Sequence, residues 1–567
     1  RDAAYRAMLE STHAVTDANP HYNCGNHNTW NLQGRLAVGA ALGDMQIIHD
    51  ALYGWRCPQC FRYGLAHQLQ HDYLSDGFHW ERAPGYHMYT LPGMTEAAMI
   101  MRNLGVNLLT HPVPALMAPD SEQDSEYARD LHPAYGPEGE RRLLAAWHAI
   151  HYCATAAGDL SLLHDSGTAN LDQLYIWGPV LEYAYDMTGD ETITRMIGHV
   201  ERRHPDAQRD TPGLPMCLQT HHGEFDWVRL AHEAYPQREL SYVRDARFGQ
   251  TGRHEGGCTL FDAWGAAVLR SDPADGAAPA AFCFFGPHSA GHQSPAALHV
   301  DLFGPAGRAT DTPHSGGYED TSHLTWVRTT IAHNTVTVDQ ASMFPYDIDT
   351  ESIWEADNWR ERASDGEVLL FQAETAFKAL RAVNDQVYPG VRLDRTVIVT
   401  RAYVLDVYRA LSDAEHDYDW AMHVVGRSVD ERRGQAVDLG EARGYVHLKN
   451  ARQVDGTDVL RFAADSAVTR CRVLPPAGGR VMLADGPRVE AAHARANRKA
   501  SSNAASPHRT ALLVRARARQ ALFVSVWRWD DGALDASVHG AAADDVTVNV
   551  NDASWRLPIA PSAVRQM

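Results

Sequence analysis

A cluster of polar residues near the start of the chain has the types needed to bind a carboxylate and move a proton. It spans residues 24–33 and reads Cys-Gly-Asn-His-Asn-Thr-Trp-Asn-Leu-Gln. Asn28 or Thr29 could cap a helix, because apolar residues at helical spacing follow directly. Asn26 and His27 would then stand at a loop-to-helix junction, where side chains can face a cleft. A capping segment with a packed histidine is the simpler alternative.

A second cluster, residues 75–89, contains a tyrosine suited to proton transfer. A phenol such as Tyr86, whose ordinary pKa is about 10, can remove a proton if a nearby cation or hydrogen bond favours the phenolate. The alternative is a tyrosine that anchors helix packing. His67 and His71 precede the cluster at i, i+4 spacing. No glutamate accompanies them, so a packed or surface pair is favoured over a metal site.

A third group of polar loops lies in the second half of the chain, at residues 286–304, 311–318 and 326–339. Strand alternation would put His299 and Asp301 on one face. Loops that converge at strand ends could form the wall of a site, and their His and Asp residues could also bind a metal ion. Ordinary polar loops that cap a sheet are the alternative.

These clusters lie on two kinds of element. Before residue 240, apolar residues recur at spacings of three and four, which predicts helices over residues 32–51, 95–109, 140–157, 170–187 and 191–203. After residue 248, short β-branched and aromatic runs predict strands over 263–269, 281–285, 297–303, 334–339, 367–371, 396–400, 403–410, 468–473 and 521–527. The pattern indicates stacked helical hairpins followed by an antiparallel sandwich.

The overall charge excludes some partners. With 51 basic and 71 acidic residues, the formal net charge of −20 argues against nucleic-acid binding. No stretch approaches the roughly 18 to 20 apolar residues that a membrane helix needs. We expect a soluble protein, and the sequence leaves open whether it is secreted, periplasmic or cytoplasmic. The sequence also leaves the oligomeric state open.

Taken in order, the three clusters resemble the heparinase II/III-like superfamily of polysaccharide lyases, which includes oligoalginate lyases and exolytic heparinases. The most specific element is Trp-x-Arg-x-Thr-x-x-His-Asn-Thr-Val-x-Val-Asp at 326–339. Asn-His-x-Thr-Trp-x-x-Gln at 26–33 and Asp-Gly-x-x-x-Glu with Tyr-His at 76–87 also match. The resemblance implies an α+β multidomain fold, with an incomplete (α/α) toroid over 1–240 and an antiparallel β-sandwich over 241–567. Relatives carry more sequence before the Asn-His element, so an N-terminal portion is expected to be missing or unusually short.

The resemblance also implies a reaction, the β-elimination of alginate or glycosaminoglycan chains. It assigns Tyr86 as general acid and, in many members, as base. His27 would assist proton abstraction, while Asn26 and His292 would neutralise the substrate carboxylate. The substrate is an anionic poly- or oligosaccharide, and cleavage is expected to be exolytic or directed at oligosaccharides. Residues expected to bind it are His87, Trp30, Gln33, Glu81, Tyr318, Arg328 and His333.

The chemistry explains these residue types. The C5 proton of a uronate is weakly acidic because the adjacent carboxylate is already negative. An amide and an imidazole can neutralise that charge and stabilise the enolate. A tyrosine or histidine then takes the proton, and a tyrosine protonates the departing O4. The product carries a C4–C5 double bond, and no metal or organic cofactor is required.

One departure from the family concerns a structural zinc ion. Many relatives read His-x-His-x-Asp where this chain has His292, Ser294 and Ala296. The weak candidates for zinc ligands that remain are Asp311 and His333, and two protein ligands rarely hold zinc. His288 or His299 could substitute.

Two other functions compete with the lyase. A glycoside hydrolase on the same toroid needs two opposed carboxylic acids, for which Asp76, Glu81, Glu224 and Asp226 are candidates. A non-catalytic glycan-binding relative is the third reading, in which the changed 292–296 segment marks lost activity.

Overall fold

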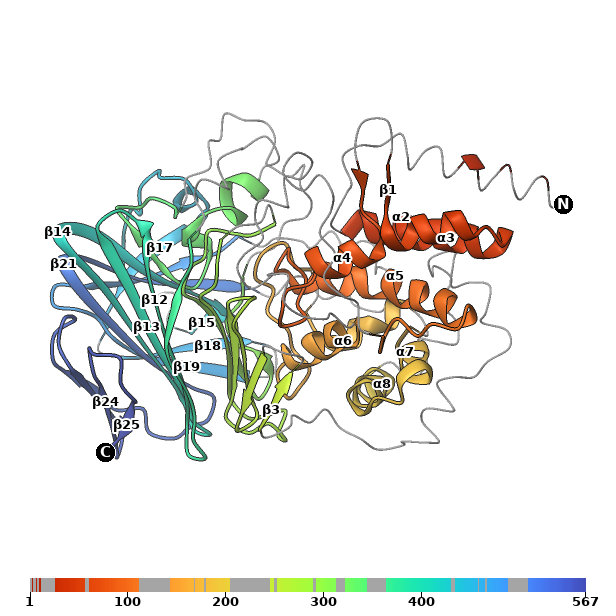
Figure 1. Cartoon of the computed structure of the whole chain (residues 1–567). Coiled ribbons are helices and arrows are strands. Elements are labelled where there is room, and N and C mark those ends of the chain that lie inside the picture. Colours follow the sequence, from red (N-terminus) through yellow and green to blue (C-terminus); the bar gives the residue numbers. More distant parts are fainter. Residues whose placement is uncertain are drawn as a thin grey trace. The chain divides into compact units, whose positions relative to one another are not determined.

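A computed structural model describes most of the chain (Figure 1). Apart from isolated positions before residue 12, the described residues are 26–56, 61–111, 143–167, 169–177, 180–203, 245–248, 252–288, 292–312, 322–343, 364–429, 434–456, 458–464, 467–487 and 508–567. They form two compact units. The first holds the described parts of 1–152, 170–241 and 247–252, and the second holds those of 153–169, 242–246 and 253–567.

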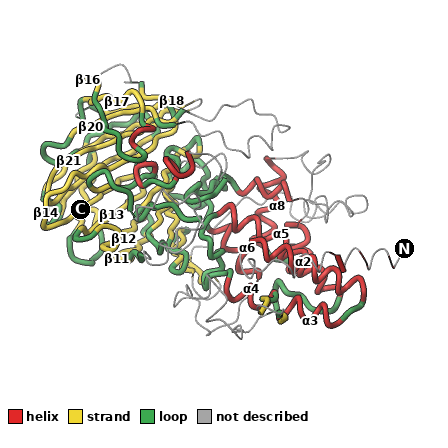
Figure 2. The backbone as a smooth tube through the Cα atoms, turned by 90° about the horizontal axis from the view of Figure 1, so that it is seen from above, coloured by secondary structure: helices red, strands yellow, loops and turns green. Residues whose placement is uncertain are grey.

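The first unit is helical (Figure 2). Its elements are α2 (Asn26–Leu42), α3 (Met45–Tyr53), α4 (Leu65–His71), α5 (Pro84–Asn103), α6 (Leu143–Tyr152), η3 (Leu171–Trp177), α7 (Val180–Thr188) and α8 (Glu191–Arg203), with the short strands β1 (Trp55–Arg56) and β2 (Phe61–Arg62). The prediction for 191–203 is confirmed. None of the described helices is long and apolar enough to cross a membrane.

Two helix boundaries differ from the predictions for local reasons. The expected helix over 32–51 is divided at Gly43, whose φ of 65° ends α2. Asp44 then caps α3 by accepting hydrogen bonds from the backbone N–H groups of Gln46 and Ile47, at 3.0 and 3.3 Å. The expected helix over 95–109 starts earlier, because Pro84 occupies the first turn of α5, where its missing N–H costs nothing.

The second unit is built of antiparallel sheets, and every pairing described in it is antiparallel. One sheet runs β3 (Asp245–Phe248), β4 (Gly252–Glu255), β5 (Cys258–Phe261), β6 (Ala266–Arg270), β7 (Ala280–Phe284), β8 (His299–Gly304) and β9 (Gly307–Arg308). A four-stranded sheet contains β22 (Ala536–His539), β23 (Val546–Val550), β24 (Ala553–Leu557) and β25 (Arg565–Gln566).

The largest sheet of this unit has twelve strands. Its main path is β11 (Glu367–Ala373), β12 (Lys378–Tyr388), β13 (Val391–Val399), β14 (Val404–Val425), β21 (Arg509–Arg528), β19 (Ala467–Leu474), β18 (Val459–Ala464) and β15 (Arg427–Ser428). Beside it lie β10 (Val336–Val338), β16 (Gln435–Ala436), β17 (Lys449–Val454) and β20 (Arg480–Asp485). The long strands β14 and β21 pair along most of their length, as Figure 1 shows. Short helical turns, η4 (His323–Val327), η5 (Thr330–Ala332) and η7 (Tyr445–His447), lie in the loops. Helices and extensive sheets together make the α+β class.

The segment Cys153–Ala169, called the strap below, clusters with the second unit. From the sequence we expected these residues to belong to the toroid over 1–240. Its position follows from buried hydrogen bonds: Arg270 Nε donates to the carbonyl of Ala154 at 2.9 Å, and Ser161 Oγ donates to Asp301 at 2.6 Å. Arg308 also donates to the carbonyl of Leu160, at 2.6 Å. Buried polar groups need such partners, so these bonds hold the strap on the sheets.

Candidate functional sites

The first candidate site joins the start of α2 to the segment before α5. Asn26 is the first residue of α2, and its Nδ2 donates to both carboxylate oxygens of Glu81, at 3.0 and 3.1 Å. Both residues are buried, and His79 Nδ1 lies 3.4 Å from Glu81. Because an ionised carboxylate only accepts hydrogen bonds, this contact fixes which way the Asn26 amide points.

Two further contacts from α2 extend this arrangement along α5. The Trp30 ring packs against that of Tyr89 with centroids 5.6 Å apart, and Gln33 Nε2 donates to Glu96 at 2.8 Å. The spacing of 26, 30 and 33 places the three α2 residues on one helix face. We call Asn26–Glu81, Trp30–Tyr89 and Gln33–Glu96 the α2–α5 seam. His27 is exposed and lies outside it.

A strained residue, Arg82, links Glu81 to the start of α5, where Tyr86 lies. Arg82, which is buried, has a φ of 60°, a conformation that residues other than glycine adopt only rarely. The chain then enters α5 at Pro84, so Tyr86 stands in the first helical turn and is partly buried. Outliers of this kind persist where surrounding contacts impose them, often at functional sites.

His87, which was predicted to bind substrate, is packed inside the first unit. Its side chain is fully buried and stacks on Phe78 at a centroid distance of 4.6 Å. Nδ1 accepts from the His79 backbone N–H at 2.9 Å, and Nε2 donates to the carbonyl of Ala146 at 2.8 Å. Burial lowers the pKa of His87 to about 4, so the ring is neutral. Both nitrogens are used within the unit, and His87 holds the segment between Glu81 and α5 in place.

The second candidate site centres on His292. Its Nδ1 lies 2.9 Å from Asp165 Oδ2, and Arg328 Nη2 donates to the same oxygen at 2.8 Å. Burial raises the pKa of Asp165, but the Arg328 charge and the His292 hydrogen bond outweigh it and leave that pKa below its usual value. Asp165 is therefore an anion beside His292. No motif or spacing in the sequence marks Asp165, because its partner His292 lies 127 residues away.

Arg328 and His333, which were predicted to bind substrate, are both buried and have hydrogen-bond partners inside the second unit. Arg328 is 2% exposed and also donates to His323 Nε2 at 3.2 Å and to the carbonyl of Gln293. His333 is fully buried, its Nε2 donates to the carbonyl of Val327 at 3.0 Å, and burial lowers its pKa well below the usual value. Tyr318, Glu224 and Asp226 lie outside the described residues.

The described residues around Asp311 do not fit a structural zinc ion. Asp311 accepts from Arg509 Nε at 3.0 Å, and Arg308 lies 3.6 Å from its other oxygen. Ser294 stands where the family resemblance predicted a histidine. No three His, Cys, Asp or Glu side chains in the described ranges are grouped to hold a metal ion. Guanidinium groups thus supply the positive charge beside Asp311.

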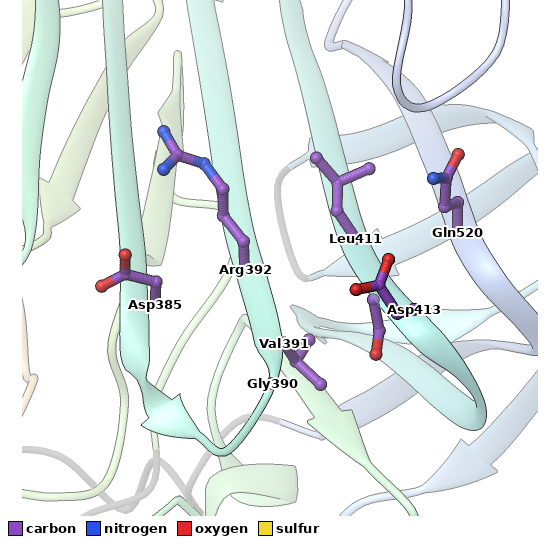
Figure 3. A pocket seen from close by; sticks show the side chains of 8 residues that line it. Asp385, Gly390, Val391, Arg392, Leu411, Asp413 and Gln520 are labelled. Carbon is purple, nitrogen blue, oxygen red and sulfur yellow. The ribbon is translucent and has the colours of Figure 1, made fainter.

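A surface pocket elsewhere on the second unit belongs to neither site. It lies at the hairpin ends of the large sheet, where Asp385, Arg392, Asp413 and Gln520 contribute polar side chains (Figure 3). None of the candidate residues lines it.

Family models match segments in both halves of the chain. The family model "Heparinase II/III-like, C-terminal" matches residues 257–529, and the model "Alginate lyase" matches residues 3–115. An alginate lyase of Stenotrophomonas maltophilia (strain K279a) is 30% identical over 162 residues, which cover 26% of this chain and 20% of that protein. An exo-oligoalginate lyase of Saccharophagus degradans is 26% identical over 145 residues, which cover 24% and 18%. These matches thus span about a fifth of either relative.

Solved structures resemble the chain over nearly its whole length. A heparinase III structure covers 95% of this chain and 68% of its own, with a TM-score of 0.57 and 14% identity. The heparan sulfate lyase HepC from Pedobacter heparinus gives a TM-score of 0.56 at 13% identity, covering 95% and 67%. At such identities the likeness concerns the fold alone.

Proposed function

Since the chain belongs to the heparinase II/III-like superfamily of polysaccharide lyases, we propose that it cleaves uronate-containing glycans by β-elimination. The observation that carries this proposal is the buried hydrogen-bonded pair of Asn26 and Glu81. Glu81 lies shortly before α5, whose first turn contains Tyr86. A carboxylate-binding amide and a phenol are the two groups that the elimination needs.

The residues of the first unit divide the work as follows. Glu81 accepts hydrogen bonds from Asn26 Nδ2 and so fixes the orientation of the amide, and in the proposed complex one Nδ2 N–H donates to the substrate carboxylate. Hydrogen bonding there stabilises the charge that develops when the C5 proton leaves. Tyr86 takes that proton, directly or with His27, and protonates the O4 of the departing sugar. His292 in the second unit has the same carboxylate-neutralising role as Asn26.

We also propose finer features of fold and substrate. The helical unit corresponds to an incomplete (α/α) toroid and the sheets to a β-sandwich, which the likeness to heparinase III supports. Alginate oligosaccharides are the first substrate to test and exolytic cleavage the expected mode, because the relatives matched in sequence are alginate lyases, one of them described as exo-oligoalginate lyase.

Ultraviolet absorbance tests the proposal, because the C4–C5 double bond of the product is conjugated to the carboxylate. The chain would be incubated with alginate, polymannuronate, polyguluronate, heparin, heparan sulfate, hyaluronan and chondroitin, and the product lengths determined. Rising absorbance on one polymer supports elimination and identifies the substrate. Reducing ends that increase without absorbance would instead indicate a hydrolase, and binding without any cleavage a glycan-binding protein.

Asn26→Ala should lower kcat by about 10²- to 10³-fold, as loss of one oxyanion-type donor does. Glu81→Gln should lower kcat less than Asn26→Ala does, because the new amide oxygen can still accept a hydrogen bond from Asn26. Some loss is expected, because the new NH2 group can also face Asn26 and reverse the orientation of its amide. Initial rates on the preferred glycan measure both. Asn103→Ala, at the exposed end of α5, is the matched control and should leave kcat unchanged. An Asn26→Ala enzyme with wild-type kcat would contradict the role assigned here.

We propose further that no structural metal ion is needed, since Arg509 and Arg308 already neutralise Asp311. Dialysis against EDTA should leave both the midpoint of thermal unfolding and the elimination rate unchanged. Metal content, measured by inductively coupled plasma mass spectrometry on untreated protein, provides the control. One zinc ion per chain, together with a lower unfolding midpoint after chelation, would refute the prediction.

A further inference from the structure

We propose that Asp165 is a positioning residue for His292, which it orients and holds in the tautomer that carries a proton on Nδ1. The inference deepens the proposed function and rests on it, because it concerns how His292 meets the uronate. Nothing in the sequence pairs the two residues, which are 127 positions apart.

Two contacts couple the strap to the loop of His292. The Asp165 carboxylate lies 2.9 Å from His292 Nδ1, and the Asp165 backbone N–H donates to the carbonyl of His292 at 3.2 Å. The side chains are only 6% and 7% exposed. A side-chain contact and a backbone contact between the same two residues fix both the position of the loop and the rotation of the ring.

Arg328 decides which partner carries the proton. Its guanidinium donates to the same Asp165 oxygen at 2.8 Å, and it is itself anchored on Gln293 and His323. A carboxylate kept ionised by this cation can only accept, so His292 must donate from Nδ1. Nε2 is then the ring nitrogen that addresses the substrate, as an acceptor when the ring is neutral and as a donor when it is protonated.

The strap is built to keep Asp165 in this place. His164 has a φ of 67°, and its Nδ1 accepts from the backbone N–H of Ser294 at 3.1 Å, two residues beyond His292. Ser161 Oγ donates to the fully buried Asp301. The left-handed backbone of His164 is strained, and it persists only where the surrounding contacts impose it. The strap therefore acts as a rigid mount for Asp165.

The arrangement suits the proposed reaction. A carboxylate on Nδ1 stabilises the imidazolium that would donate from Nε2 to the uronate carboxylate, as the carboxylate of a serine-protease triad does for its histidine. It also removes the ring rotation and tautomer exchange that would otherwise accompany each turnover. Asp165 does not touch the substrate in this scheme and acts only through His292.

The first test is the tautomer of His292 in the wild-type chain. Two-bond ¹H–¹⁵N spectra of protein labelled with ¹⁵N-histidine report the protonated nitrogen, and His292→Gln identifies the signals of this ring. We expect the neutral ring to carry its proton on Nδ1. A proton on Nε2 instead would overturn the inference, and this readout depends on neither turnover nor the stability of a variant at position 165.

The second test is kinetic. Asp165→Asn keeps the shape and removes the charge. By analogy with metal-binding histidines that lose the carboxylate on their other nitrogen, it should lower kcat by about 10- to 100-fold, with little change in KM. Asp159→Asn on the same strap is the matched control and should keep the wild-type kcat. Wild-type kcat in a folded Asp165→Asn enzyme would refute the positioning role. If the wild type turns over no glycan, the proposed function fails, while the ring spectra still decide whether Asp165 holds the tautomer.

Discussion

Tyr86→Phe is expected to lower kcat by about 10⁴-fold, the upper end of what one general acid–base group contributes. The large value follows from the double role proposed for the phenol, which would both remove the C5 proton and protonate the departing O4. The substitution removes one oxygen and keeps the ring, so α5 should keep its packing and the glycan should still bind. Initial elimination rates and calorimetric titration with an oligosaccharide measure the two effects separately.

Tyr53→Phe is the matched control for this loss. Tyr53 ends α3 and is 50% exposed, so removal of its hydroxyl should change neither rate nor binding. A Tyr86→Phe enzyme within tenfold of the wild-type rate would show that another group transfers the proton. Loss of glycan affinity along with rate would instead assign Tyr86 a binding role.

Arg395→Met is expected to lower the free energy of unfolding by about 3 to 5 kcal/mol, the cost of leaving one partner of a buried ion pair without the other. Arg395 on β13 donates from Nε and Nη2 to the two oxygens of Asp406 on β14, each at 2.8 Å. It also donates to the carbonyls of Leu298 and Asn334, which lie within the third group of polar loops. The variant would bury the Asp406 carboxylate without its cation, and denaturant unfolding measures the cost.

Arg392→Met is the control, because Arg392 lies on the same strand with its side chain exposed. It should change stability by no more than about 0.5 kcal/mol, as surface substitutions usually do. The double variant Arg395→Met/Asp406→Leu should recover part of the loss, since it removes the stranded charge. Equal stability of the Arg395 and Arg392 variants would show that the ion pair contributes little.

The local patterns of the sequence predicted the elements with uneven success. The helix at 191–203 and the strand at 468–473 agree with α8 and β19, since each pattern is strong and uninterrupted. The strand predicted at 403–410 is only the first part of β14, which continues to Val425 because β21 pairs with it across an irregularity after Leu411. A local pattern cannot show how far a strand continues when its length depends on pairing with a strand that is distant in the sequence.

The candidate site residues were also predicted with uneven success. Asn26 and Glu81 were named from motifs, and the structure places them in direct contact. His87, Arg328 and His333 share those motifs but are buried with internal partners. A motif gives the residue types and their spacing. It does not show whether a side chain contacts the substrate or instead holds another side chain that does so in place.

By itself, the sequence determined the order of helices before strands, the family and the chemical types of the candidate groups. Side-chain type, periodicity and short motifs are properties of neighbouring residues, so they can be read without the fold. The tertiary structure alone decided that Arg509 neutralises Asp311 and that the strap brings Asp165 to His292. Those contacts join residues more than a hundred positions apart, and they form because buried charges and buried polar groups must find partners wherever the packed chain supplies them.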